Sequence, residues 1–145
     1  MKNFLAVVVL SQLFSANGIA ENLADVSVSV NNIEPSKGRI MVALEKDPAS
    51  FEMKAISRPL YLGQFINADK ISVTVVFEDI PAGTYAIKAF HDENSNQKLD
   101  TGLFGIPTEL FGFSNDARAT FGPPEFKDAS FKVDGIAQRH IIKLK

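Results

Sequence analysis

A stretch of ten residues, from His91 to Asp100, carries the side chains of this chain that are best suited to chemistry. It reads His-Asp-Glu-Asn-Ser-Asn-Gln-Lys-Leu-Asp, so polar residues recur at alternate positions from Asp92 onward. Calcium binds six to eight hard oxygen ligands, and EF-hand-type loops present them in this alternating order. The sequence therefore predicts a calcium site in a turn. Its expected ligands are the side chains of Asp92, Asn94 and Asn96, the main-chain carbonyl of Lys98, and Asp100 directly or through water.

Two positions of this loop depart from the EF-hand pattern. Gln97 occupies the sixth position, where a glycine usually allows the sharp turn, and Leu103 occupies the twelfth, where a bidentate glutamate is usual. The missing carboxylate is expected from outside the loop, with Glu109 and Asp116 as the nearest candidates, and Glu109 completes the predicted set. The alternative is a metal-free turn in which Asn and Asp side chains bond to their own backbone.

The candidates for catalysis are the two histidines and one serine, Ser114. His91 opens the loop and His140 lies near the end of the chain, without the paired spacing of a zinc site. A hydrogen-bonded His91 at a strand end is favoured over a zinc ligand or general base. Ser114 lacks the GxSxG context of a hydrolase. We therefore expect a protein that is not an enzyme, with a weak hydrolase using His91 and a carboxylate as an alternative.

Residues 1–20 have the pattern of a secretory signal peptide. Lys2 precedes the apolar run from Phe4 to Leu10, and small residues lead to Ala20. Cleavage after Ala20, or alternatively near Ala16, predicts a mature domain of residues 21–145 that is secreted or periplasmic. No later segment has the ~20 consecutive apolar residues of a membrane helix.

Composition limits the other possibilities. The chain has 145 residues, which suits one domain, and no cysteine, so disulfides cannot stabilise it. The formal net charge is -2 and the basic residues are scattered. A nucleic-acid partner is therefore not expected.

The apolar patterning predicts an all-β protein. Alternating valines from Val26, and β-branched runs such as Ile71–Phe77, are typical of strands. No long helix is predicted, although a short one around residues 49–55 is considered, and Thr84–Phe90 is expected to form a hairpin with Ile71–Phe77. A single antiparallel β-sandwich, of the immunoglobulin-like kind, is the economical architecture. The expected strands are residues 26–31, 38–44, 71–77, 84–90, 126–133 and 139–144, with a seventh within 61–66.

A long irregular segment, residues 102–126, follows the predicted calcium loop. It contains Phe104, Phe111, Phe113, Phe121 and Phe126 among several glycines and prolines. Loops longer than about 12 to 15 residues without regular structure tend to be functional. The phenylalanines are expected to pack mostly inward. The alternative is an exposed recognition surface for a protein or glycan partner.

Several motifs of the chain resemble those of the bacterial family called domain of unknown function 2141. The resemblance covers about residues 38–145 and implies an exported protein to which no activity is assigned. The usual loop of that family reads HDxNxNGxxD, so Gln97 replaces its glycine. The motifs are Pro81–Ile87, His91–Asp100, Gly105–Glu109, Gly112–Asn115 and Pro123–Ala129.

The Pro-x-Gly-x-Tyr turn at residues 81–85 also looks like a feature of transthyretin-like and Cna-B-type sandwiches. In the latter, loops of this composition bind calcium structurally, which is an analogy of fold and not of function. Together, these patterns predict an exported, non-enzymatic sandwich that binds calcium and has a binding or envelope-associated role.

Overall fold

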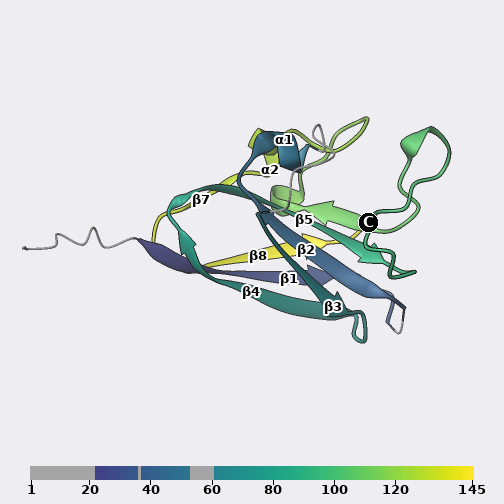
Figure 1. Cartoon of the computed structure of the whole chain (residues 1–145), viewed down its shortest axis with the longest axis horizontal. Coiled ribbons are helices and arrows are strands. Elements are labelled where there is room, and N and C mark those ends of the chain that lie inside the picture. The colour runs from purple at the N-terminus through teal and green to yellow at the C-terminus, as the bar shows by residue number, and fades with distance from the viewer. Residues whose placement is uncertain (1–21, 36, 53–60) are drawn as a thin grey trace, which may run out of the picture.

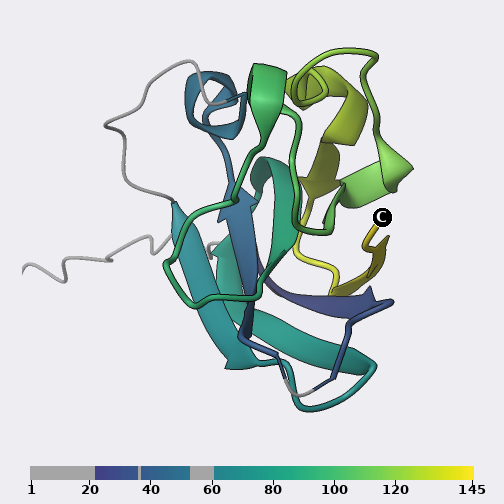
Figure 2. The ribbon, with the colours of Figure 1, turned by 90° about the vertical axis from the view of Figure 1, so that its right-hand side faces the viewer.

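The structure is a computed structural model that describes residues 22–35, 37–52 and 61–145. Two β-sheets pack face to face, with short helices and long loops gathered over the outer side of one of them (Figures 1 and 2). The predicted signal peptide lies outside the described residues. In chain order the elements are β1 (Leu23–Asn31), β2 (Arg39–Glu45), α1 (Pro48–Phe51), β3 (Leu62–Asn67), β4 (Ser72–Pro81), β5 (Gly83–Asp92), η1 (Leu103–Gly105), β6 (Phe111–Phe113), η2 (Ser114–Asp116), α2 (Phe126–Ala129), β7 (Phe131–Val133) and β8 (Gln138–Lys143).

The smaller sheet has the strand order β4-β1-β8 and follows the alternation in the sequence. Val26, Val28 and Val30 of β1 are fully buried, while the residues between them are only partly buried. Full burial of a valine side chain contributes about 1.5–3 kcal/mol. One face of this sheet therefore forms half of the core.

The larger sheet has the order β3-β2-β5-β6, with β7 also paired to β5. Its central strands β2 and β5 are buried on both faces over most of their length. Ile40, Val42 and Ile87 face the smaller sheet, whereas Met41 and Phe90 pack on the outer side. The continuous apolar run in β2 thus reflects a strand covered from two sides.

The prediction of an all-β sandwich is confirmed, but the predicted hairpin is wrong. β4 pairs with β1 in one sheet and β5 pairs with β2 in the other. The turn from Pro81 to Gly83 therefore carries the chain between the sheets. Tyr85 stabilises this corner by donating its hydroxyl to the Pro81 carbonyl at 2.9 Å. Burial, followed by the contact with Tyr61, raises the pKa of Tyr85 to about 12.

Three further details differ from the expected architecture. β8 runs parallel to β1, so the smaller sheet is mixed and not purely antiparallel. The expected strand 126–133 is divided into helix α2 and the short strand β7. The irregular segment contributes its own strand, β6, which brings the described strands to eight. The seventh predicted strand is confirmed as β3.

Most phenylalanines of the long loop do pack inward. Phe113 and Phe126 meet Phe51 edge to face, with ring centroids 5.6 and 5.7 Å apart. Phe111 packs against Met41 and Phe90 on the outer face of the larger sheet. These contacts explain how a loop of this length stays compact beside β5. Among the described residues, no helix is long and apolar enough to cross a membrane.

Candidate functional site

The predicted calcium loop begins where β5 ends. Asp92 pairs with Arg39 of β2 in the strand register and is fully buried. Its carboxylate accepts two backbone N–H groups, from Asn96 to Oδ1 at 2.9 Å and from Gln97 to Oδ2 at 2.8 Å. Ser95 and Gln97 have left-handed φ values of 59° and 65°. Asp92 thus fixes the sharp turn that follows it.

Asp100 lies at the other end of the loop from Asp92, and its carboxylate accepts hydrogen bonds from two amide side chains. Asn94 Nδ2 donates to Asp100 Oδ2 at 2.6 Å, and Asn96 Nδ2 donates to Oδ1 at 2.8 Å. The amide oxygens of Asn94 and Asn96 accept the N–H groups two residues ahead, at 3.0 and 2.8 Å. The fold therefore brings Asn94, Asn96 and Asp100 together through side-chain hydrogen bonds of the kind expected for the metal-free turn, and the role of these residues as metal ligands stays a prediction.

Glu109 approaches the same loop through its backbone. Its Oε1 accepts the N–H of Glu93 at 2.9 Å, and its Oε2 accepts the N–H of Asp100 at 2.9 Å. Glu109 is buried, so this carboxylate ties the two ends of the loop together. Asp116, the other candidate carboxylate, instead forms an ion pair with Lys145 at 2.8 Å.

Three carboxylates, those of Asp92, Asp100 and Glu109, are thus held by neutral donors only. None of the ion pairs found within residues 22–35, 37–52 and 61–145 involves any of them. The structure does not group three His, Asp or Glu side chains in this part of the chain closely enough to hold a metal by themselves. A cation at this loop would need the amide and carbonyl oxygens as well.

The donor set fits calcium better than zinc because every available ligand is an oxygen. Each Asn oxygen that accepts one N–H keeps a second lone pair for a cation. Side-chain rotation would have to move the two amide nitrogens away from Asp100, since nitrogen donors repel a cation. The roles of the Lys98 carbonyl and of Glu109 as ligands stay predictions.

His91 lies on the opposite side of β5 from Asp92, because successive strand residues point to opposite faces. Its ring is fully buried and its Nε2 lies 2.6 Å from the Lys37 carbonyl. Nδ1 has no hydrogen-bond partner among the described residues. The predicted hydrogen bond at a strand end is present. This burial gives no support to His91 as a base acting on a substrate.

Ser114 is also buried and bonded within the fold. Its hydroxyl donates to the Ala129 carbonyl at 2.5 Å and accepts the N–H of Ile87 at 2.8 Å. These bonds join η2 to β5 and α2. The hydroxyl links structural elements and does not face a pocket.

A buried polar cluster on the outer face of the larger sheet was not predicted from the sequence. Glu45 Oε1 lies 3.1 Å from Lys88 Nζ, although the geometry there is that of an ion pair and not of a hydrogen bond. Ser50 Oγ donates to Glu45 Oε2, and Lys88 donates to the Ser50 carbonyl, both at 3.1 Å. The sequence did contain a signal for this cluster, because Glu45 and Lys88 are charged residues within the otherwise apolar strands β2 and β5. The cluster pairs its charges internally and secures α1 to the sheet.

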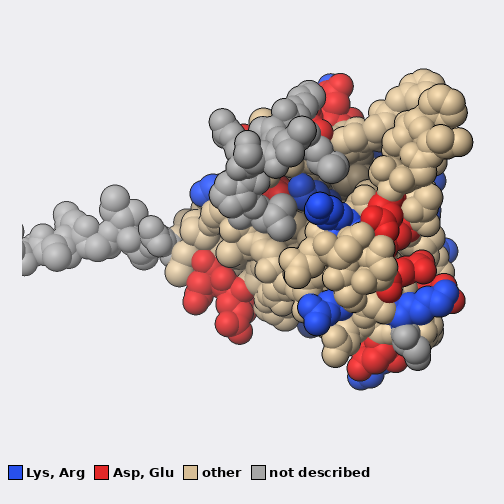
Figure 3. All heavy atoms as spheres, turned by 45° about the vertical axis from the view of Figure 1, so that its right-hand side comes forward, with Lys and Arg blue, Asp and Glu red and all other residues tan. Residues whose placement is uncertain are grey.

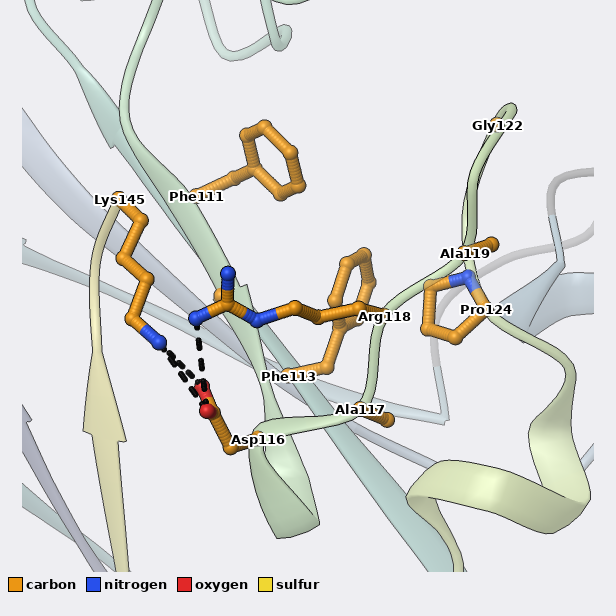
Figure 4. A pocket seen from close by; sticks show the side chains of 10 residues that line it. Phe111, Phe113, Asp116, Ala117, Arg118, Ala119, Gly122, Pro124 and Lys145 are labelled. Carbon is orange, nitrogen blue, oxygen red and sulfur yellow. Dashed lines mark hydrogen bonds and ion pairs between the residues drawn. The ribbon is translucent and has the colours of Figure 1, made fainter.

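A small hollow opens beside β6, and Figure 4 shows Phe111, Phe113 and the Arg118 side chain among the groups that line it. Asp116 stands at its edge, bound by Lys145 at 2.8 Å and by Arg118 at 3.4 Å. The hollow measures about 210 Å³. Pockets for small molecules usually span about 300–1,000 Å³. The hollow is therefore smaller than the usual pocket for a small molecule.

Comparison with known proteins identifies one relationship. Residues 28–141 match the model of a family described as an uncharacterized protein conserved in bacteria (DUF2141). No curated protein and no solved structure matches the chain.

Proposed function

We propose, from the premise that this chain belongs to the DUF2141 family of uncharacterized bacterial proteins, that it is an exported, non-enzymatic β-sandwich whose Asp92–Asp100 loop binds calcium. The cation has a structural role, bracing the loop for a binding or envelope-associated function.

One observation carries the calcium proposal. The side-chain amides of Asn94 and Asn96 both converge on the Asp100 carboxylate, with their nitrogens 2.6 and 2.8 Å from its two oxygens. Asp92 anchors the same turn at its buried start. A divalent cation would neutralise carboxylates that have only neutral donors among the described residues.

Calcium would act by joining the two ends of the loop. Asp92 belongs to the end of β5, while Asp100 begins the segment that leads to η1 and β6. Because Gln97 and Leu103 replace the glycine and glutamate of the EF-hand pattern, we expect affinity in the range of about 10⁻⁴ to 10⁻³ M that is typical of extracellular modules.

Export rests on the sequence of residues 1–20, with Lys2, an apolar run and a small-residue end. It is tested by fractionating cells that express the full chain and sequencing the amino terminus of the product. A mature protein that begins at Glu21 in the periplasmic or secreted fraction is expected. Full-length protein in the cytoplasm would contradict export.

The non-enzymatic assignment is supported by the burial of His91 and Ser114, which occupy the two candidate catalytic positions. It is tested by screening the purified protein with ester, amide and phosphate substrates. Turnover that is lost in His91→Gln while folding is retained would contradict it.

Calcium binding is tested by calorimetric titration and by thermal unfolding with calcium or with a chelator. Calcium at 100 times its dissociation constant adds about 2.7 kcal/mol of stability, which raises Tm measurably. Asp100→Asn should abolish most of this gain, because it removes a charge at the point where both amides converge. Heat of binding and a Tm shift are both expected for the parent protein.

Glu93→Gln is the matched control. It removes one carboxylate from the same loop, but the Glu93 side chain lies 4.0 Å from Lys37 and outside the predicted ligand set. Its calcium-dependent Tm shift should equal that of the parent. The calcium proposal fails if the parent shows no heat and no shift, or if both variants lose the shift equally.

A further inference from the structure

A loop beyond the predicted calcium site exposes three large apolar side chains. Leu103 is 83%, Phe104 97% and Ile106 64% exposed. We call residues 101–107, the loop that contains η1, the apolar tip, and Figure 3 shows the uncharged projection at the upper right to which it contributes. None of its seven residues carries a charge. Exposed apolar groups of this kind mark interaction sites in soluble proteins.

The apolar tip is an ordered structure with internal hydrogen bonds. A β-bridge pairs Thr101 with Pro107, and Gly102 donates its N–H to the Ile106 carbonyl at 2.8 Å. The N–H groups of Gly105 and Ile106 bond to carbonyls at Gly102 and Leu103. Each backbone donor that is bonded within the tip lowers the cost of entering an apolar medium.

Phe104 holds a left-handed backbone conformation, with φ 62°. For a residue other than glycine this conformation is unfavourable, and such strain concentrates at functional sites. Here it accompanies a phenylalanine ring that is almost wholly in solvent. The fold therefore presents the ring and does not shelter it.

The shape and size of the apolar tip decide between possible partners. Three side chains offer at most a few hundred Å² of apolar surface, whereas a specific protein interface buries about 800 Å² on each partner. The tip is convex and uncharged, so it has no groove for a peptide. A lipid bilayer needs no matching surface, because its interface deforms around inserted apolar side chains.

We infer that the apolar tip inserts into a lipid bilayer surface and docks the protein there reversibly. A second contact is available on the same end of the molecule. Phe121 is 91% exposed in the segment between η2 and α2, which rises to the same end as the apolar tip in both Figure 1 and Figure 2. One membrane plane can touch both.

The chain contains no tryptophan, which allows a clean test. Phe104→Trp in the full mature protein introduces the only tryptophan, at the tip, and its emission can be excited selectively over that of the tyrosines. With vesicles of phosphatidylethanolamine and phosphatidylglycerol, its emission should shift to the blue, and brominated lipid should quench it. Ile136→Trp is the matched control, because Ile136 is 68% exposed in the turn between β7 and β8, away from the tip. Its emission should not change.

A vesicle flotation assay measures the energetic contribution. Phe104→Ser should lower the partition coefficient on the order of tenfold or more, since it removes the largest inserted side chain. Ile136→Ser should leave it unchanged. Both variants should melt with the parent, because both side chains are exposed. No blue shift and no flotation would overturn the inference.

Two other outcomes would also overturn it. A blue shift of Phe104→Trp that depends on protein concentration without vesicles would assign the tip to a second copy of the chain. A shift that needs a separate envelope protein, and not lipid, would assign it to that partner. The inference does not rest on calcium, so flotation that persists in chelator, together with no calcium effect on Tm, would refute only the calcium proposal.

Discussion

Gly38 lies directly against the carbonyl of Asp92. A Cβ atom at position 38 would stand 1.9 Å from that oxygen and 2.6 Å from the Cα of Glu93. Gly38 also has a left-handed φ of 59°. Both the space and the backbone conformation therefore require glycine, at the place where β2 begins beside the start of the candidate cation loop.

Gly38→Ala should destabilise the protein by at least about 2 kcal/mol, because the methyl group meets immovable backbone and the φ value is strained as well. Chemical denaturation measures the free energy of unfolding. Gly122→Ala is the control, since its φ of 69° is similar but a Cβ there meets nothing within 4 Å. It should cost only about 1 kcal/mol. Equal losses would show that the contact with Asp92 contributes nothing.

Gln97→Gly should raise the free energy of unfolding by up to about 1 kcal/mol, because glycine relieves the left-handed strain at φ 65°. The N–H that Gln97 donates to Asp92 is kept. Calcium affinity should be at least that of the parent, as calorimetry will show.

Lys98→Gly serves as the comparison for that prediction. Lys98 is exposed and has no positive φ, so glycine there should lower stability by about 0.4–1 kcal/mol through the entropy of the unfolded chain. If Gln97→Gly and Lys98→Gly lost the same free energy of unfolding, the backbone at Gln97 would not be strained.

His140 should make the protein less stable in weak acid. Burial lowers the pKa of His140 below its ordinary 6.5, and the ring packs on Phe131 with centroids 3.9 Å apart. As the pH falls below 6.5, His140 takes up a proton in the unfolded chain before it does so in the folded protein. The stability contributed by the neutral, buried ring is therefore present above pH 6.5 and is lost as the pH falls. The loss is limited to about 1.4 kcal/mol per pH unit for one proton.

His140→Phe keeps the packing on Phe131 and removes the titration. Denaturation curves at pH 7.5, 6.5 and 5.5 should show the parent losing stability relative to this variant. The NMR titration of His140 should give a pKa below 6.5. A constant difference between the two proteins across this range would refute the prediction.

The local patterns predicted individual strands well. The alternating valines of β1 and the run in β4 each describe one strand with one buried face, and local sequence is enough for that. The pairing of strands could not be predicted from the same local patterns. The turn at Pro81 and Gly83 suits a hairpin. However, β4 pairs with β1 and β5 pairs with β2, so the two strands join different sheets. Strand pairing depends on the whole core.

The long loop illustrates the same limit. Five phenylalanines in one segment look alike in sequence, but Phe111, Phe113 and Phe126 pack against the outer face of the larger sheet, whereas Phe104 and Phe121 remain exposed. Composition gives the number of apolar side chains. Only the path of the chain decides which of them reach a surface to cover.

The sequence by itself determined the class of the fold and the residues of the candidate cation loop, because the two-residue period of strands and the spacing of Asp and Asn side chains are local properties. Tertiary structure alone decided that His91 and Glu109 are buried, that Gly38 supports Asp92, and that Leu103, Phe104 and Ile106 project into solvent. Burial and close approach depend on segments distant in the chain, which no local pattern specifies.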